Sequence, residues 1–314
     1  MKEIVIAADL GGTNLRMATV DQRGAVLFRT KRKTPRGERP EEIVQAIVGG
    51  ALECQKNCSD FQVKAICAAV PATVSAERGL IFKAPNLPAL DNFQMAAALE
   101  KELGIKSILE NDANAAAVGE NWLGASKGFA SSVFATLGTG VGGGIIIDGK
   151  ILRGADGTAG EIGHICVEPF GVLCGCGAHG CLEQYSSATG IVRLAKELES
   201  KYPQSKLKQN LRLTAYDIYQ AGTNGDELAL EVFRQMGFYL GVALAGLVNV
   251  LNPETIIIGG GASGGWSLFL PHVRKTICQR AYHEPAQRAQ ILIATLGDDA
   301  GIIGAARLAF NSLN

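Results

Sequence analysis

The sequence predicts an α/β protein of two domains whose halves share a repeated unit. Its 314 residues, 47% of them hydrophobic, are enough for two buried cores. Segments with the alternation of strands and segments with helical periodicity follow one another along the chain. A strand, a glycine-rich turn and a second strand occur at residues 10–21 and again at 137–148, an offset of 127 residues. This repeat indicates a duplicated fold whose two turns face each other across a cleft.

The first half of the chain opens on a β-meander and continues with helices and buried strands. The glycine turn separates the first two strands, Pro71 ends a later strand, and prolines mark 84–88 as a loop. The expected strands are 4–9, 14–21, about 25–31, 63–70 and 107–110, and the expected helices are 40–54, 92–103 and 113–122.

The second half is expected to be richer in helix. Residues 226–250 form a long, largely apolar helix fit for a domain core, and Asp298 and Asp299 are placed to cap the last helix. The other expected elements are helices at 186–201, 214–221, from about 268, and 300–310, with strands at 255–258 and 291–296.

The first glycine turn has the composition of a phosphate site. Gly11, Gly12 and Thr13 leave backbone N–H groups unobstructed, so that an anion can approach them closely. Asp9, at the end of the preceding strand, could hold a magnesium ion. Taken alone, the turn is equally compatible with a plain hairpin.

Recurrence of the turn favours a nucleotide. Gly138 and Thr139 repeat the pattern, and two facing turns can grip the two ends of a polyphosphate. The GxxxxGK[ST] motif of a Walker loop is absent from the sequence. At the end of the strand 255–258, Gly259, Gly260 and Gly261 suit close approach of a flat ligand, most simply the adenosine part of the nucleotide.

A carboxylate at a predicted helix start is the candidate base. Asn111 and Asp112 immediately precede the alanine-rich helix, and either could be an ordinary N-cap. A carboxylate there could equally accept the proton of a substrate hydroxyl while that oxygen attacks phosphorus, because the helix dipole keeps the carboxylate ionised.

Three cysteines within eight residues predict a metal centre. Cys174, Cys176 and Cys181 are separated by glycines that let the loop fold tightly, and tetrahedral zinc needs one further ligand, His164 or His179. Physical reasoning leaves the choice of histidine open. Buried or redox-active cysteines are the alternative, and a disulfide is disfavoured because Cys174 and Cys176 are too close in sequence. A site with four protein ligands would be structural, because it leaves no position for water. If the fourth ligand came from outside the loop, the metal would fix Glu161 relative to Glu183, and these carboxylates could bind a polar substrate.

Charge and hydropathy exclude several classes of partner. Thirty basic residues balance thirty acidic ones, so the sequence predicts neither nucleic acid nor an anionic membrane as partner. Asp9 interrupts the N-terminal apolar run far short of a signal sequence or a membrane span. Eight cysteines without secretory features predict a reducing cytoplasm.

With these residues in place, the chain resembles the ROK family of bacterial sugar kinases and sugar-responsive repressors over nearly its whole length. The resemblance rests on six motifs, of which the two central ones are highly specific in this order and spacing. They are DLGGT from Asp9, END from Glu110, LGTGVGG from Leu137, EIGH from Glu161, CGCGAHGCLE from Cys174 and GDDAG from Gly297.

The family implies an actin-like, hexokinase-like (ribonuclease H-like) ATPase fold of two α/β domains, with ATP and sugar meeting in the cleft between them. The expected boundaries are 1–118 plus 299–314 for a smaller domain and 119–298 for a larger domain with the zinc loop. A homodimer or tetramer is expected by resemblance only.

The resemblance also assigns roles to residues. Asp112 becomes the general base for the 6-hydroxyl of the sugar, and His164 completes the zinc site. The other implied sugar ligands are Asn86, Asn111, Glu161, His164 and Glu183; the implied nucleotide ligands are Gly11, Gly12, Thr13, Gly138, Thr139, Gly259, Gly260 and Gly261, with Asp9 serving Mg²⁺.

Glucose is the expected acceptor, because the stretch 183–189 resembles the glucokinases of the family more than its N-acetylhexosamine kinases. N-acetylmannosamine, N-acetylglucosamine and fructose are the alternatives. A repressor is less expected, since the first phosphate strand starts at Ile4 and leaves no room for a helix-turn-helix before it. Ala68-Ala-Val-Pro71 departs from the G-x-P-G stretch of many members, which leaves backbone contacts of that loop open.

Overall fold

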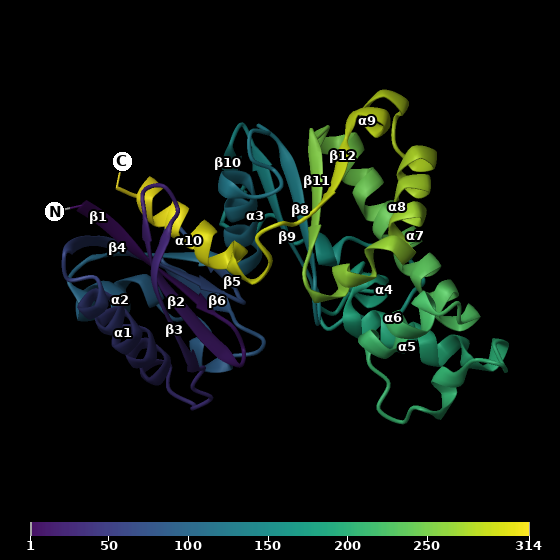
Figure 1. The fold of residues 1–314 in the computed structure, drawn as a ribbon, viewed down its shortest axis with the longest axis horizontal. Helices are drawn as coiled ribbons and strands as arrows, with labels where there is room; N and C mark the ends of the chain where they lie inside the picture. The colour runs from purple at the N-terminus through teal and green to yellow at the C-terminus, as the bar shows by residue number, and fades with distance from the viewer. Residues whose placement is uncertain (1, 314) are drawn as a thin grey trace. The chain divides into compact units, whose positions relative to one another are not determined.

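Two five-stranded sheets organise the chain, and the structure, a computed structural model, describes residues 2–313. Two compact units result (Figure 1). The first unit comprises the chain up to Ala130, Gly144–Gly160 and the chain from Thr295 onward; the second comprises Ser131–Gly143 and Glu161–Ala294. The first unit thus includes residues 119–130, 144–160 and 295–298, which the boundaries expected from the sequence place in the larger domain.

The sheet of the first unit has the strand order β3-β2-β1-β4-β7. The first three strands pair antiparallel, and β1, β4 and β7 run parallel. Its strands are β1 (Lys2–Leu10), β2 (Asn14–Asp21), β3 (Val26–Lys33), β4 (Phe61–Val70) and β7 (Lys106–Asn111). Parallel pairing aligns Asp9 with Ala69 and Ala69 with Glu110, so the ends of β1 and β7 share one edge of the sheet.

Both faces of this sheet are covered. Alternate residues of β1 point to opposite faces. Ile6 and Leu10 pack with α1 (Pro40–Asn57) and α2 (Met95–Leu103), whereas Val5 and Ala7 pack with α3 (Asp112–Leu123) and α10 (Ala300–Asn311). Figure 1 shows α1 and α2 on the side of the sheet away from α10. The remaining elements of this unit are β5 (Thr73–Ser75), β6 (Leu80–Lys83), η1 (Pro88–Leu90) and η6 (Gly297–Asp299).

Helices α3 and α10 touch backbone to backbone. A Cβ atom at Gly304 would lie 1.6 Å from the carbonyl oxygen of Ala115, and one at Gly119 would lie 2.3 Å from that of Ala300. Only glycine permits this approach. The contact fixes the helix that begins with Asp112 against the C-terminal helix of the same unit.

Buried Glu120, on α3, holds the segment that leads into α10. Its carboxylate accepts hydrogen bonds from the backbone N–H groups of Ala125 at 2.7 Å, Thr295 at 3.0 Å and Leu296 at 2.8 Å. The strand expected at 291–296 is therefore wrong at its end, because β12 (Gln290–Ile293) stops earlier. The N–H of Ala294 still donates to the carbonyl oxygen of Ile258 at 2.9 Å, but those of Thr295 and Leu296 bind the Glu120 side chain instead of the sheet.

The second sheet has the order β10-β9-β8-β11-β12, in which β8, β11 and β12 run parallel. Its strands are β8 (Ser132–Leu137), β9 (Val141–Ile147), β10 (Lys150–Ile151), β11 (Thr255–Gly259) and β12 (Gln290–Ile293). The other elements of the second unit are η2 (Ile162–His164), α4 (Glu183–Ser186), α5 (Ala188–Leu198), η3 (Glu199–Lys201), η4 (Lys206–Gln209), α6 (Ala215–Thr223), α7 (Glu227–Leu251), η5 (Gly261–Gly265), α8 (Trp266–Arg280) and α9 (His283–Arg288).

Helix α7 is the core helix of the second unit. Phe233, Met236 and Leu240 pack in one buried cluster with Leu137 of β8 and Ile258 of β11. The helix is capped at its start by the side chain of Asp226 and at its end by Asn252, which has φ of 49°. Its length and composition would allow it to cross a membrane, but 61% of its most apolar window is buried, as in the core helix of a globular unit.

Candidate active site and metal centre

The first glycine turn connects β1 to β2. The N–H of Gly11 donates to the carbonyl oxygen of Asn14 at 2.9 Å, and the Thr34 hydroxyl donates to the carbonyl oxygen of Gly11 at 2.6 Å. A Cβ atom at Gly12 would lie 3.7 Å from the Cβ of Asn86. Asn86, an implied sugar ligand, therefore lies beside the implied phosphate turn.

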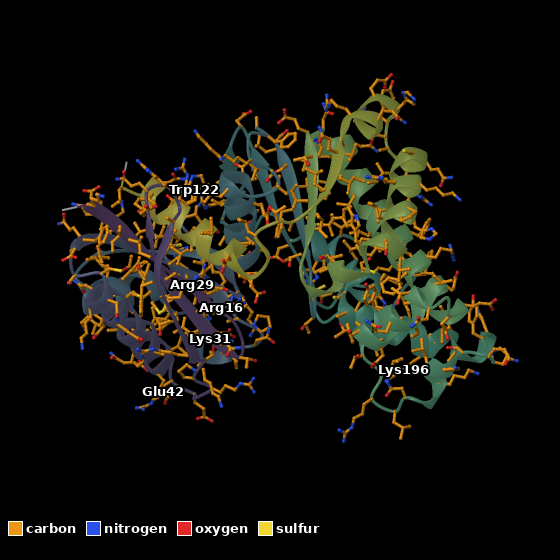
Figure 2. The ribbon with its side chains drawn as sticks, viewed as in Figure 1. Arg16, Arg29, Lys31, Glu42, Trp122 and Lys196 are labelled. Carbon is orange, nitrogen blue, oxygen red and sulfur yellow. The ribbon has the colours of Figure 1, made fainter. Side chains whose placement is uncertain are left out.

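Asp9 is a partly buried acid at this turn. Its carboxylate lies 3.4 Å from Nε of Arg16, the residue opposite it on β2, and a Cβ atom at Gly301 would lie 3.4 Å from its carboxyl carbon. Arg16 also pairs with Asp298 at 3.0 Å, and Figure 2 shows this arginine beside Arg29 on the adjoining strand. Burial raises the pKa of Asp9, Arg16 lowers it, and Asp298 raises it further. The ionised carboxylate of Asp9 therefore lowers the stability of the folded state.

We expect Asp9→Asn to raise the thermal unfolding temperature near pH 7. A carboxyl whose pKa is raised in the folded state contributes stability at pH values below its unfolded pKa, and this contribution is lost as the pH rises through the folded pKa. The advantage of the variant should therefore be present at pH 7 to 8 and fade toward pH 4. Thermal unfolding across this range measures it, with Asp60→Asn on the surface as control. A lower unfolding temperature of Asp9→Asn at pH 7 would contradict the expectation.

The candidate base and the helix cap are two different residues. Oδ1 of Asn111 accepts a hydrogen bond from the N–H of Asn114 at 3.0 Å, and its amide donates to the carbonyl oxygen of Ala72 at 3.1 Å. Asn111 is therefore the N-cap of α3. Asp112 is the first residue of the helix, half-buried, and its Oδ1 accepts from the N–H of Ala113 at 2.8 Å.

Sequence reasoning missed the ion pair that supports Asn111. Glu110 is 1% exposed, and its Oε2 accepts from Nε and Nη2 of Arg153 at 3.0 and 2.7 Å. Its Oε1 accepts from the N–H of Asn111 and the side-chain amide of Asn114, both at 3.1 Å. A glutamate in a buried strand signals that a cation must lie nearby, but the sequence does not identify one 43 residues away.

Loss of the Arg153 guanidinium should destabilise the first unit. Arg153→Met leaves the buried Glu110 carboxylate without its cation, so we expect a loss of about 2 to 3 kcal/mol, because Arg153 itself is partly exposed. Adding Glu110→Gln to Arg153→Met should restore much of the lost free energy of unfolding, because it removes the uncompensated charge. Urea unfolding measures both. Arg29→Met, which removes an exposed pair with Asp299, should cost less than about 1 kcal/mol. Equal losses for Arg153→Met and Arg29→Met would contradict this account.

Glu183 supports the second glycine turn, which connects β8 to β9. Its Oε2 accepts from the N–H of Val141 at 3.0 Å, and a Cβ atom at Gly140 would lie 2.1 Å from the same oxygen. The Thr189 hydroxyl donates to the carbonyl oxygen of Thr139 at 2.8 Å. Glu183, an implied sugar ligand, thus also holds the implied phosphate turn, a contact that the sequence did not predict.

Glu161 lies within electrostatic reach of Glu183 and His164. Partial loss of hydration raises the pKa of Glu161, the His164 charge lowers it and the Glu183 charge raises it. The residue as a whole is exposed. The implied sugar ligands of the second unit therefore form one cluster.

The structure brings His164, Cys174, Cys176 and Cys181 together. Their potential ligand atoms all lie within 4.8 Å of one another. Cys176 Sγ lies 3.6 Å from Cys181 Sγ, and Cys174 Sγ lies 3.8 Å from Nδ1 of His164. Ligands at about 2.3 Å from a tetrahedral zinc would be separated by about 3.8 Å, so the spacing fits zinc.

The chemistry of the thiols also fits a cation. The N–H of Ala178 lowers the pKa of Cys176, whereas burial raises the pKa of Cys181 to about 12. Neighbouring thiols cannot all ionise unless a cation compensates their charges. The side-chain amide of Gln184 donates to Cys174 Sγ at 3.7 Å, as an outer partner of a metal ligand does.

The geometry separates the two histidines. Nδ1 of His179 lies 3.0 Å from the carbonyl oxygen of Gly171, and His179 is not in the cluster. Glycine permits the tight loop: Gly177 and Gly180 have φ of 92° and 70°, and a Cβ atom at Gly180 would lie 1.7 Å from the carbonyl oxygen of Glu168.

The third glycine turn lies after β11. Gly260 has φ of 83°, and a Cβ atom there would lie 2.5 Å from the carbonyl oxygen of Leu137. A Cβ atom at Gly261 would meet nothing within 4 Å. Gly260 thus packs against the end of β8, while Gly261 leaves room for a ligand.

Each half of the chain contains two strands joined by a glycine turn, which is the arrangement of an actin-like ATPase fold. Solved sugar kinases of this fold align with nearly the whole chain. The ROK hexokinase of Thermus thermophilus gives a TM-score of 0.84 at 30% identity and covers 99% of both chains. The ROK glucokinase of Streptomyces griseus, solved with glucose and AMPPNP, gives 0.81 at 36% identity over 98% of this chain and 99% of that one.

Sequence comparison gives the same assignment. The sequence model described as the ROK family matches residues 5–312, and the chain belongs to this family. The glucokinase of Halalkalibacterium halodurans is 38% identical over 307 residues, which cover 95% of this chain and 92% of that protein. The expected family and fold are thereby confirmed.

Regulators of the family share the fold as well. A ROK family transcriptional regulator, a homologue of the Escherichia coli Mlc protein, gives a TM-score of 0.89 at 28% identity. The alignment covers 98% of this chain and 77% of the regulator. Fold alone therefore does not separate kinase from regulator, and the site residues must do so.

Proposed function

We propose that this chain is an ATP-dependent glucokinase that transfers the γ-phosphoryl group to the 6-hydroxyl of glucose. The observation that carries the proposal is the shared sheet edge of the first unit, where the Gly11–Gly12 turn follows β1 and Asp112 follows β7. A phosphate turn and a carboxylate at one edge suit phosphoryl transfer to a hydroxyl. The glucokinase relatives support glucose as the acceptor.

Asp112 is the proposed general base. It takes the proton of the 6-hydroxyl while that oxygen forms a bond to the γ-phosphorus and the bond from this phosphorus to the β,γ-bridging oxygen breaks. ADP leaves with the electron pair. Positioning and charge neutralisation supply most of the acceleration in such transfers.

The proposed sugar ligands have hydrogen-bonding capacity to spare. Asn111 uses one lone pair for Asn114 and one N–H for Ala72, which leaves one acceptor and one donor position for a sugar hydroxyl. His164 turns Nδ1 toward Cys174, so its Nε2, on the opposite edge of the ring, could reach the sugar while the residue also holds zinc. Asn86, Glu161 and Glu183 complete the proposed set.

For the nucleotide we propose backbone and acidic groups. Gly11, Gly12 and Thr13 would hold one part of the polyphosphate and Gly138 and Thr139 the other, with Gly259, Gly260 and Gly261 on the adenosine side. Asp9 would hold Mg²⁺, which neutralises charge on the phosphates when bound.

Zinc has a structural role in this proposal. His164, Cys174, Cys176 and Cys181 would hold it with no open position for water. The ligands span the chain between Glu161 and Glu183, so the metal would hold these two carboxylates in register. We further propose a homo-oligomer, a dimer or tetramer, that acts in glycolysis in the cytoplasm without nucleic acid or membrane partners.

A coupled assay of ADP release tests the proposal. The acceptors are glucose, mannose, fructose, N-acetylglucosamine and N-acetylmannosamine, with ATP, Mg²⁺ and zinc-loaded protein. We expect glucose to lead in kcat/KM by at least about 10²-fold, because a site built for hydroxyls rejects an N-acetyl group. A leading N-acetylated sugar would overturn the acceptor but keep the chemistry, and no turnover of any sugar would overturn the kinase.

A further inference from the structure

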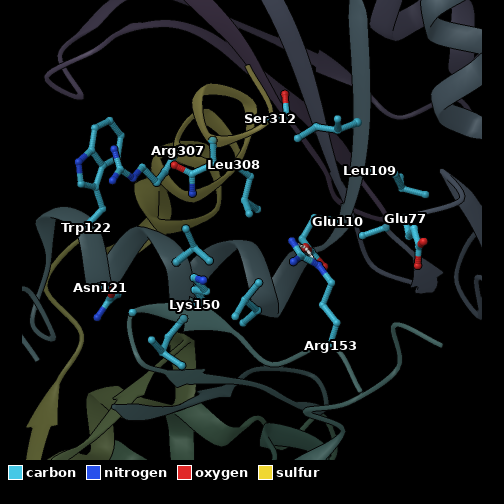
Figure 3. Close-up of a pocket in the computed structure, with 17 residues that line it drawn as sticks. Glu77, Leu109, Glu110, Asn121, Trp122, Lys150, Arg153, Arg307, Leu308 and Ser312 are labelled. Carbon is cyan, nitrogen blue, oxygen red and sulfur yellow. Dashed lines mark hydrogen bonds and ion pairs between the residues drawn. The ribbon is translucent and has the colours of Figure 1, made fainter. Parts of the chain in front are cut away.

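The first unit contains a cavity that the proposed reaction does not use. It has a volume of about 670 Å³ and lies among β7, α3, the β9–β10 hairpin and α10 (Figure 3). This volume is typical of sites for small molecules. Ile108, Val118 and Ile146 contribute apolar surface to its wall.

The cavity wall carries an excess of positive charge. Its basic residues are Lys150, Arg153 and Arg307, and its acids are Glu77 and Glu110. Glu110 is buried, and Arg153 compensates its negative charge. Within residues 2–313, the structure pairs neither Lys150 nor Arg307 with a carboxylate.

The two arginines of the cavity wall are held in different ways. Arg307 lies over the ring of Trp122, 5.2 Å from its centroid, which fixes the guanidinium at one side of the cavity. Figure 3 shows Arg153 turned toward Glu110 at the other side. Arg153 remains 39% exposed, so the face of its guanidinium away from Glu110 can still receive a ligand.

This cavity is connected to the candidate base through one carboxylate. Arg153 binds one oxygen of Glu110, and the other oxygen holds the N–H of Asn111 and the amide of Asn114. Asn114 is 2% exposed, and its Oδ1 has no partner among the described residues, so the hydrogen bond to Glu110 is what orients its side-chain amide. A ligand that draws Arg153 away from Glu110 would therefore disturb the cap in front of Asp112.

We propose that this cavity binds a phosphoryl dianion, either a phosphate monoester of a small metabolite or free phosphate, and that its occupancy changes turnover through Arg153 and Glu110. Guanidinium groups bind phosphate oxygens in pairs, and Lys150 adds a point charge. The effect on turnover rests on the proposed kinase function, whose product is itself a phosphate monoester. The binding of the dianion does not depend on that function.

Fluorescence of Trp122 tests the binding directly. The chain has two tryptophans, so Trp266→Phe leaves Trp122 as the reporter in the cavity wall. Titration with glycerol 3-phosphate should give a saturable change, and titration with glycerol should give none. Inorganic phosphate is the second ligand: weaker binding than the monoester indicates a monoester site, and equal binding indicates a free-phosphate site, each in support of the proposal.

Matched variants complete the test. In the Trp266→Phe background, the double variant Lys150→Met, Arg307→Met should raise the dissociation constant of glycerol 3-phosphate at least tenfold. Because Arg307 contacts Trp122 and its loss can itself change the fluorescence, calorimetry should measure the same constant. Lys196→Met, at a surface lysine on α5 in the second unit, should leave it unchanged. No saturable signal, or equal binding by the double variant, would overturn the site.

The coupling has its own readout. Saturating glycerol 3-phosphate should change kcat of the wild-type enzyme at least twofold and leave kcat of the Lys150→Met, Arg307→Met variant unchanged. Binding without an effect on kcat would overturn the coupling alone. Absence of any kinase activity would be a failure of the proposed function, and the fluorescence result would still decide the site.

Discussion

Asp112→Asn should lower kcat by about 10²- to 10⁴-fold and leave the dissociation constant of glucose within about threefold of wild type. Asn keeps the size and much of the hydrogen bonding of the side chain but cannot take a proton. Because Asn111 and not Asp112 caps α3, the substitution leaves the cap of the helix in place. Steady-state kinetics and calorimetric titration of glucose measure the two quantities.

Two controls separate a loss of chemistry from a loss of structure. Asp148→Asn, at an exposed turn, should leave kcat unchanged. The unfolding temperature of Asp112→Asn should stay close to that of wild type. Retention of kcat within about tenfold would remove Asp112 from the role of base.

Loss of the metal centre should have the second largest effect. Cys181→Ser removes a buried member of the Cys₃His cluster, and we expect loss of bound zinc, a fall in unfolding temperature of about 10 °C, and at least a tenfold weaker affinity for glucose. The affinity should fall because Glu161 and Glu183 flank the cluster in the chain. Elemental analysis, thermal unfolding and glucose titration measure the three effects.

The matched control is Cys278→Ser, since Cys278 is exposed and lies outside the cluster. It should keep zinc, unfolding temperature and affinity. Chelation of wild-type protein should reproduce Cys181→Ser, and readdition of zinc should reverse the chelation only. Full glucose affinity in zinc-free protein would contradict a structural role of the metal in the sugar site.

The sequence predicted the elements that depend on local pattern. The strand expected at 14–21 is β2 without change, and the helix expected at 40–54 is α1, extended to Asn57. Apolar alternation and helical spacing predict the bounds of such elements to within a few residues. The helix expected at 186–201 was wrong as one element: Ser187 accepts a hydrogen bond from the N–H of Gly190, so α4 ends at Ser186 and α5 begins at Ala188.

The contacts that support the site could not be read from the sequence. Arg153 binds Glu110, Glu183 holds the N–H of Val141, and Glu120 holds Thr295, each across more than 40 residues. A buried acid shows that a partner exists, but which donor reaches it depends on the packing of whole elements. The three cysteines of the metal centre were predictable because they lie in one loop, whereas the choice of His164 over His179 came from the family resemblance and not from the spacing.

The most direct test of the proposed activity is to locate the transferred group. Zinc-loaded protein is incubated with ATP, Mg²⁺ and glucose labelled with ¹³C at carbon 6, and the product is observed by ³¹P and ¹³C NMR. The account predicts a phosphate monoester whose phosphorus couples to the labelled carbon, together with an equal amount of ADP. Phosphate on another oxygen of the sugar, or release of inorganic phosphate without a sugar ester, would contradict it.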